Sequence, residues 1–235
     1  MEKIPIWKVI AERIKLDIVK EHLAPGTKLP TEAACAKRFN VNRHTVRHAI
    51  SLLVEDGLVY TRRGSGAFVA MKPVRYSVNK HVRFHQSIEA MGHDANKRIL
   101  SLSTRIADSE ECKVLSLGKS DFVHVAEGIA YIDTTPVAHY ISVFPAKRFP
   151  KMLEYLEQNS SFTKSLAACG VLDYTRAITR LTAVRANATT AALLNLKSGA
   201  ALMRSINVNV DMKNIAIEYG CTWFSGDHIE FIIEP

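Results

Sequence analysis

Cysteine is scarce and scattered in this sequence. The four cysteines, Cys35, Cys112, Cys169 and Cys221, are separated by 77, 57 and 52 positions, and no CxxC pair occurs. Zinc ribbons and disulfide-stapled small domains need paired cysteines at short spacing. Isolated cysteines are instead typical of proteins in a reducing compartment. The sequence therefore predicts neither a zinc ribbon nor a disulfide framework.

Long apolar runs are also missing. No stretch approaches the roughly 18 consecutive apolar residues that a transmembrane helix needs. Charged side chains interrupt residues 1–20, so this segment lacks the apolar core of a secretory signal. We therefore expect a cytoplasmic protein without a membrane segment.

Acidic residues are few in the first third of the chain. The whole sequence has 31 Lys and Arg against 23 Asp and Glu, a formal charge of +8. Residues 1–75 contain 14 basic and 7 acidic side chains, whereas residues 76–235 contain 17 and 16. A local basic excess favours contact with a polyanion. The sequence therefore predicts two domains, of which the first binds a polyanion.

The basic third contains three segments with the spacing of amphipathic helices. We expect these helices over residues 6–22, 32–38 and 43–56. Thr31 and Asn42 directly precede the second and third helices, and both residue types are good N-caps. Gly57 follows the third helix, where glycine commonly ends a helix.

The third helix has two different faces. Val46, Ala49, Ile50 and Leu53 repeat at helical spacing and form an apolar face. The opposite face carries Arg43, His44, Arg47, His48 and Ser51. Arginine side chains can pair with guanine edges and with phosphates in the major groove. The two later helices and their four-residue turn therefore predict a helix-turn-helix.

A basic hairpin follows the third helix. Short β-like runs at residues 58–61 and 67–69 flank the glycine-containing turn at residues 62–66. Glycine allows backbone to approach a narrow groove or phosphates closely. The order of these elements predicts a winged helix that binds double-stranded DNA. One alternative is that the basic helix face is merely solvated, and another is that His44 and His48, spaced i,i+4, bind a metal.

These segments resemble the GntR family of bacterial transcription regulators. The resemblance rests on Leu23–Glu32, Ala36–Val41, Arg43–Arg47, Asp56–Val59 and Arg63–Val69. It implies a homodimer that binds a palindromic operator. The positions that match the DNA contacts of the family are Thr31, Glu32, Arg43, His44, Thr45, Arg47, Arg63, Gly64, Ser65 and Gly66.

The neutral two-thirds of the chain mixes strand-like and helical segments. Strand-like runs occupy residues 99–105, 122–133, 136–144, 174–185, 201–210, 215–224 and 229–233. Helical segments fit residues 84–91, 109–117, 147–157, 161–169 and 187–195. This pattern predicts an α+β fold with a mostly antiparallel sheet.

This second part resembles the UTRA effector domain of the HutC subfamily, which implies a chorismate-lyase-like fold. The resemblance rests on Arg83–Gly92, Ser161–Leu166, Glu218–Trp223 and Asp227–Phe231, and it is strongest to phosphonate-metabolism regulators. It implies a pocket for a small, often anionic effector, such as a phosphonate. The matching pocket positions are Arg83, Phe84, His85, Ser161, Thr163, Glu218 and Trp223. The domains expected are a winged helix-turn-helix at 1–70, a linker at 71–80, and an effector-binding and dimerisation domain at 81–235.

The sequence departs from the UTRA pattern at one place. Many members carry two arginines on a strand where this chain has Gly128 and Ala130. The departure leaves open an effector with less charge, an effector in a different position, or a domain without one. Phe84 and Trp223 are also typical core aromatics. Glu218 is harder to explain as filler, because a carboxylate that faces a core needs a partner.

Three functions are consistent with these patterns. The first is a ligand-responsive repressor, the second an enzyme built on the lyase-like domain, and the third an architectural DNA-binding protein. Residues 76–235 show no Ser/His/Asp order, metal triad or phosphate-binding loop. We therefore expect no enzyme, no catalytic residue, no cofactor and no metal. The prediction is a transcription regulator that binds operator DNA as a homodimer.

Overall fold

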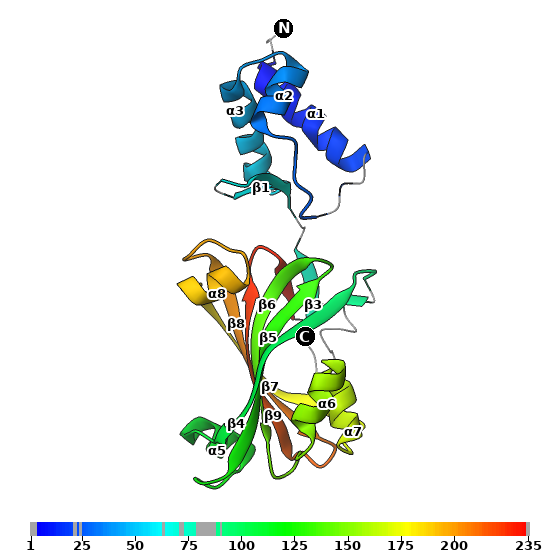
Figure 1. Cartoon of the computed structure of the whole chain (residues 1–235), viewed down its shortest axis with the longest axis vertical. Coiled ribbons are helices and arrows are strands. Elements are labelled where there is room, and N and C mark those ends of the chain that lie inside the picture. Colours follow the sequence, from blue (N-terminus) through cyan, green and yellow to red (C-terminus); the bar gives the residue numbers. More distant parts are fainter. Residues whose placement is uncertain are drawn as a thin grey trace. The chain divides into compact units, whose positions relative to one another are not determined.

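Three helices form in the basic third of the chain in the computed structural model (Figure 1). They are α1 (Ile6–Lys20), α2 (Glu32–Phe39) and α3 (Arg43–Glu55). The structure describes residues 4–20, 23, 25–62, 64–70, 73–78, 88–89 and 91–233. The helix bounds agree closely with the ranges expected from apolar spacing.

Both predicted N-caps are present. The side-chain oxygens of Thr31 and Asn42 accept hydrogen bonds from the backbone N–H three residues later, at 3.2 and 2.8 Å. At the other end of α3, Gly57 takes a φ of 68°, and the N–H of Leu58 donates to the carbonyl of Leu53 at 2.9 Å. This is a Schellman motif, in which a left-handed residue ends the helix. Local chemistry therefore sets both ends of α3.

The apolar faces of α1 and α3 pack against each other. Val46, Ala49 and Leu53 are at most 1% exposed. The buried core of this unit consists of Ile10, Ala11, Ile14, Leu29, Cys35, Val46, Ala49, Ile50, Leu53, Val59, Ala67 and Val69. Burying one large aliphatic side chain contributes roughly 1.5–3 kcal/mol. The core therefore fixes which face of α3 is turned to solvent.

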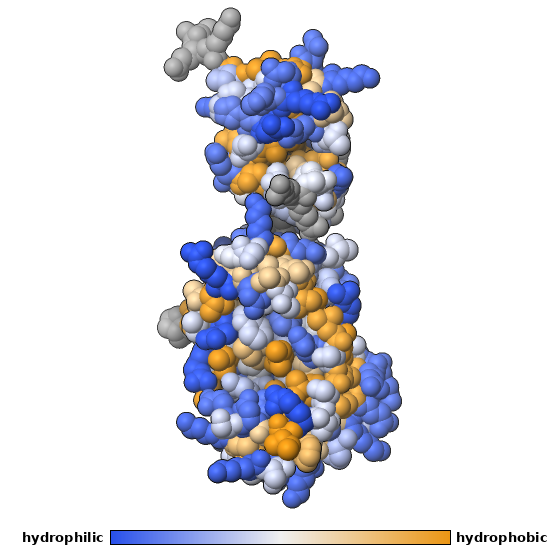
Figure 2. Space-filling view, turned by 60° about the vertical axis from the view of Figure 1, so that its left-hand side comes forward, coloured by the Kyte–Doolittle hydropathy of each residue, from blue (hydrophilic) through white to orange (hydrophobic). Residues whose placement is uncertain are grey.

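The predicted hairpin follows α3. Strands β1 (Val59–Arg62) and β2 (Gly66–Val69) pair antiparallel, with Arg62 opposite Gly66. Together with α1–α3, the hairpin completes a winged helix-turn-helix. On the face drawn in Figure 2, hydrophilic residues cover much of this unit, with hydrophobic patches between them.

The chain divides into two compact units, residues 1–72 and 73–235. Part of the range 71–80, which was expected as a linker, forms a strand of the second unit. Within it, β3 (Val74–Ser77) pairs in parallel with β10 (Ile229–Ile232) near the other end of the second unit.

A six-stranded sheet forms the centre of the second unit. Its strands are β4 (Ala95–Ile106), β5 (Phe122–Ile132), β6 (Thr135–Pro145), β7 (Tyr174–Arg185), β8 (Ala201–Asp211) and β9 (Ala216–Ser225). The spatial order is β4-β5-β6-β9-β8-β7, and every neighbouring pair is antiparallel. Strands β5 and β6 are buried over most of their length, because helices cover both faces there. The edge strand β4 is mostly exposed, and the edge strand β7 contains no buried residue.

In the described part of the second unit, four short helices cover the two faces of this sheet. They are α5 (Ser109–Leu115), α6 (Met152–Asn159), α7 (Phe162–Ala168) and α8 (Ala188–Leu193). In Figure 1, α6 and α7 lie on one side of the sheet, and α5 and α8 lie on the other. The second unit is therefore α+β with an antiparallel sheet, as the strand-like runs predict.

One predicted helix starts later in the structure than expected. The helix expected over residues 147–157 begins only at Met152, because residues 146–148 and 150–151 form turns. Pro150 disfavours helical backbone in the residue before it, which explains the late start. The helix expected over residues 84–91 lies largely outside the described residues. No helix in the described part of the chain is long and apolar enough to cross a membrane.

Candidate functional site

The polar face of α3 is open to solvent. Arg43, His44, Arg47, His48 and Ser51 are all exposed, on the side opposite the buried apolar face. This is the two-faced helix that the sequence predicts. Its exposed face offers cationic and hydrogen-bonding groups at the position of a recognition helix.

Two of the predicted DNA-contacting residues bind each other. Arg47 donates from Nε and Nη2 to the two carboxylate oxygens of Glu32, at 3.0 and 2.7 Å. These hydrogen bonds hold the pKa of Glu32 below its usual value and raise the pKa of Arg47. The side chain of Arg47 remains 59% exposed. A bidentate pair of this kind fixes the direction of a guanidinium group without burying it.

One of the two histidines of α3 has an aromatic packing partner. His48 stacks on Trp7 of α1, with ring centroids 4.0 Å apart and an interplanar angle of 16°. Among the residues that the structure describes, no group of three His, Cys, Asp or Glu could hold a metal ion. The side chain of His48 is therefore part of the packing between α1 and α3.

Small residues occupy the described part of the hairpin tip. Gly64 and Gly66 have φ values of 74° and 103°, which favour glycine. Ser65 between them is exposed, and Arg63 lies outside the described residues. Lys28 was not predicted as a contact, yet its Cε would lie 3.4 Å from a Cβ added at Gly66. The loop that contains Lys28 therefore adds a cation beside the wing.

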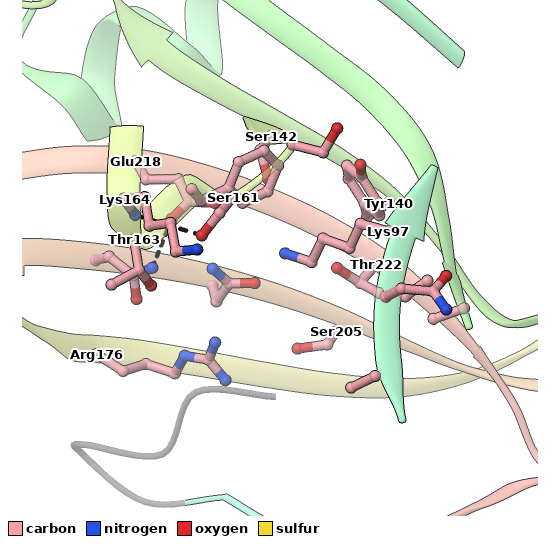
Figure 3. Close-up of a pocket in the computed structure, with 18 of the residues that line it drawn as sticks. Lys97, Tyr140, Ser142, Ser161, Thr163, Lys164, Arg176, Ser205, Glu218 and Thr222 are labelled. Carbon is pink, nitrogen blue, oxygen red and sulfur yellow. Dashed lines mark hydrogen bonds between the residues drawn. The ribbon is translucent and has the colours of Figure 1, made fainter. Parts of the chain in front are cut away.

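The second unit contains a cavity of about 530 Å³ on the sheet face that α6 and α7 cover (Figure 3). Pockets for small molecules commonly have volumes of this size. The wall contributed by the sheet is rich in amides and hydroxyls, including Ser142, Ser205, Asn207, Asn209 and Thr222. Ser142, Ser205, Asn207 and Asn209 are each less than 8% exposed. Such groups can bind a ligand with several polar atoms.

Lys97 of β4 extends into this cavity (Figure 3). Its ammonium lies 4.0 Å from the ring centroid of Phe162 and 5.2 Å from that of Tyr140. The pKa of Lys97 is lowered to about 8, chiefly by burial; the charge of Glu218 opposes this shift and that of Arg176 contributes to it. In the described part of the chain no carboxylate forms an ion pair with Lys97. Lys97 is thus a half-buried cation that lines the cavity.

Glu218 of β9 supplies one acidic group of the cavity, and Glu89 also lines it. Glu218 is 5% exposed, and its Oε2 accepts a hydrogen bond of 2.6 Å from the amide of Asn209 on β8. The sequence indicates that a carboxylate at position 218 needs a polar partner, and Asn209 is that partner.

The predicted pocket residues fall into three groups. Ser161, Thr163 and Glu218 line the cavity, where Ser161 caps α7 and Thr163 Oγ1 lies 3.1 Å from the hydroxyl of Tyr174. Arg83, Phe84 and His85 lie outside the described residues. Trp223 does not line the cavity.

Trp223 is on the opposite face of β9 from Glu218. It stacks on His139, with ring centroids 5.3 Å apart, and packs against the apolar cluster beneath α8. Side chains alternate between the faces of a strand, so residues five positions apart in β9 point to opposite sides. In this structure Trp223 is therefore half-buried on the other face of the sheet and is not among the residues that line the cavity.

The departure at Gly128 and Ala130 also has a structural explanation. Tyr140 on the neighbouring strand lies over Gly128, where an added Cβ would be 2.3 Å from the tyrosine hydroxyl. Ala130 lines the cavity, and its Cα partner on β4 is Lys97. The cation of this part of the cavity thus comes from the adjoining strand. Residue periodicity missed Lys97, because the strand expected there began only at Ile99.

Comparison with known proteins agrees with both units. The profile of bacterial regulatory proteins of the gntR family matches residues 7–69, and that of the UTRA domain matches residues 90–230. An uncharacterized HTH-type transcriptional regulator of Rhizobium meliloti is 33% identical over 232 residues, which cover 98% of this chain and 95% of the relative. The HTH-type transcriptional repressor PhnF of Mycolicibacterium smegmatis is 26% identical and covers 93% of this chain and 88% of its own.

A solved structure shows the same architecture. The crystal structure of PhnF from Mycobacterium smegmatis superposes with a TM-score of 0.68 at 26% identity, covering 95% of this chain and 98% of that one. These relatives are transcription regulators rather than enzymes. The chain therefore belongs to the GntR family of bacterial transcription regulators, with a UTRA domain as its second unit.

Proposed function

We propose that this GntR-family regulator is a ligand-responsive repressor that binds a palindromic operator as a homodimer in the cytoplasm. The observation that carries the proposal is the exposed face of α3, where Arg43 and the Glu32-bound Arg47 are presented beside a glycine hairpin. The DNA contacts that we assign are Thr31, Glu32, Arg43, His44, Thr45, Arg47, Arg63, Gly64, Ser65 and Gly66.

The effector acts by a shift in population. Dimeric helix-turn-helix proteins bind half-sites about 34–36 Å apart, one helical turn of DNA. An effector that prefers a dimer with a different spacing or mobility of its two DNA-binding units lowers operator affinity by its differential affinity for the two states. We place the effector in the cavity of the second unit, at Ser161, Thr163 and Glu218. The resemblance to phosphonate-metabolism regulators favours a small phosphonate or another small anion.

The proposal is tested by selecting operator sequences from random DNA with the full chain. We expect an inverted repeat, a complex of two chains per operator by analytical ultracentrifugation, and release by a member of a panel of phosphonates, sugar phosphates, urocanate and amino acids. Selection of no consensus would contradict the operator assignment and favour an architectural DNA-binding protein. A bound chain that no panel member releases would contradict the ligand-responsive part.

The Glu32–Arg47 pair makes a separate prediction. Replacing Glu32 by Gln removes a negative charge that would face phosphates, so affinity for random DNA should rise. The preference for operator over random DNA should fall about tenfold, because Arg47 loses the partner that directs it. Fluorescence anisotropy with both DNAs at one salt concentration measures the two affinities.

Glu12→Gln is the matched control for this prediction. Glu12 is an exposed residue of α1, so this variant loses the same charge away from α3. It should leave the operator preference unchanged. An unchanged preference in Glu32→Gln itself would show that the pair does not direct Arg47 on DNA.

A further inference from the structure

The cavity receives cations from both edges of the sheet. Lys97 comes from β4 and Arg176 from β7, and Figure 3 shows both side chains extending toward the same space. The Nε of Arg176 is buried without a hydrogen-bond partner among the described residues, and its Nη1 makes only a long contact of 3.4 Å with the hydroxyl of Tyr76. Lys97 contacts aromatic rings and no carboxylate within the described chain. Both residues are half-buried, and partly desolvated cations without an ion-pair partner cost free energy, which an anionic ligand can offset.

The cation on β4 depends on two small residues of β5. Lys97 and Ala130 are Cα partners, so a large side chain at position 130 would compete for the same space. Gly128 admits the ring of Tyr140, and that ring and Phe162 flank the Lys97 ammonium. Gly128 and Ala130, which stand where many UTRA domains carry arginines, therefore leave the space that Lys97 of the adjacent strand β4 occupies.

Glu218 gives the cavity a second recognition end. Asn209 occupies its Oε2, whereas no described residue donates to Oε1. On the same wall, the amide of Asn207 folds over Gly220, where an added Cβ would be 2.9 Å from the amide nitrogen. A carboxylate oxygen in such a place accepts from a hydroxyl or an ammonium group. A fully deprotonated inorganic anion such as sulfate cannot supply that donor.

We propose that Lys97 binds the acid group of the effector, in place of arginines on β5, and that Glu218 binds a hydroxyl or ammonium group of the same molecule. The effector is then a small acid with at least one hydrogen-bond donor at a distance from the acid group. The cavity of about 530 Å³ accommodates such a molecule, since one water occupies about 30 Å³. This inference rests on the proposed function, because it assigns the effector to this cavity.

The test measures binding of defined probes to the full chain without DNA, by titration calorimetry. One set is 2-aminoethylphosphonate, ethylphosphonate and ethanolamine, and a second is gluconate, hexanoate and glucitol. In each set the first compound has both groups, the second only the acid and the third only the donor. We expect tightest binding by a compound with both groups. Lys97→Gln should weaken its binding roughly 10- to 150-fold, as expected for losing a hydrogen bond to a charged group.

Variants separate Lys97 from the charge of its strand. Arg98→Gln removes one positive charge from the adjacent residue, which lies on the other face of β4 beside Tyr131, and should bind as the parent does. Glu218→Gln should weaken compounds with both groups and leave the acid-only compounds unaffected. Without ligand, Lys97→Gln should melt at the parental temperature or above, because it removes a desolvated charge.

Equal binding of every probe by the parent and Lys97→Gln, including no binding by either, would overturn the inference. Equal losses in Lys97→Gln and Arg98→Gln would also overturn it, since the effect would then be one of general charge. Failure of the proposed function has a different signature. In that case the chain binds the acids in a Lys97-dependent manner, but none of them releases the operator.

Discussion

Replacing Arg43 by Ala should weaken operator binding roughly 5- to 150-fold at physiological ionic strength. Arg43 is the first residue of α3, it is exposed, and within the described chain it forms no ion pair. Its guanidinium is therefore available for a guanine edge or a phosphate. Titration of the selected operator, followed by fluorescence anisotropy at several salt concentrations, measures the loss.

The salt dependence tells which group Arg43 contacts. If Arg43 binds a phosphate, the slope of log affinity against log salt should fall by about one in the Ala variant, with similar losses on operator and random DNA. If it binds a base edge, the loss should appear mainly on the operator, and Arg43→Lys should not restore it. Lys113→Ala, an exposed charge loss on α5 of the other unit, should change neither measurement. Parental affinity in Arg43→Ala would refute the assignment of α3 as the recognition helix.

Arg47 should behave differently from Arg43. Arg47→Ala should also weaken operator binding, but its effect on the preference for operator over random DNA should not add to that of Glu32→Gln, because the two side chains form one bidentate unit. Additive losses would mean that Arg47 acts on DNA independently of Glu32.

The contrast between these arginines shows what periodicity can and cannot predict. Helical spacing places both on the exposed face of α3, since the apolar face must be buried. The partner of Arg47 lies 15 positions earlier at the start of α2, and the partner of His48 is on α1. These contacts depend on how three helices pack, which the spacing within one helix does not contain.

The same limit applies more strongly to the cavity. Ser161, Thr163 and Glu218 match pocket positions of the family, whereas Lys97 comes from β4 at one edge of the sheet and matches none of them. Asn96, Lys97 and Arg98 interrupt the apolar alternation by which a half-buried strand is recognised. Because Lys97 points toward a polar cavity, the start of this strand lacks the apolar pattern of a strand. The range expected for β4 therefore begins at residue 99, whereas the strand begins at Ala95.

Gly128 illustrates how an apparent loss in the sequence can be a packing requirement. At this position an added Cβ would lie 2.3 Å from the Tyr140 hydroxyl and 2.5 Å from the carbonyl oxygen of Arg98. Side-chain movement can relieve the first contact, but the second involves backbone of the paired strand β4. The absence of an arginine here follows from Tyr140, which is 3% exposed and packs edge-on against Phe162.

Gly128→Ala should therefore destabilise the second unit by about 1–3 kcal/mol, the usual cost of overpacking a close-packed site. For a unit of this size, each kcal/mol lowers the melting temperature by roughly 2–4 °C, which calorimetry resolves. Gly118→Ala is the matched control, because its added Cβ would meet only the Asp121 side chain at 3.4 Å. That variant should melt near the parental temperature.

A second substitution separates the two contacts at Gly128. Adding Tyr140→Ala to Gly128→Ala removes the clash with the ring but leaves the clash with the Arg98 carbonyl. Relative to Tyr140→Ala alone, the added cost of Gly128→Ala should thus shrink without disappearing. A full cost in that background would assign the strain to the backbone of β4, and no cost would assign it to the tyrosine. Parental stability in Gly128→Ala would mean that β4 and Tyr140 shift at little cost to admit the added methyl group. The position of Lys97 beside Tyr140 would then not depend on a glycine at position 128.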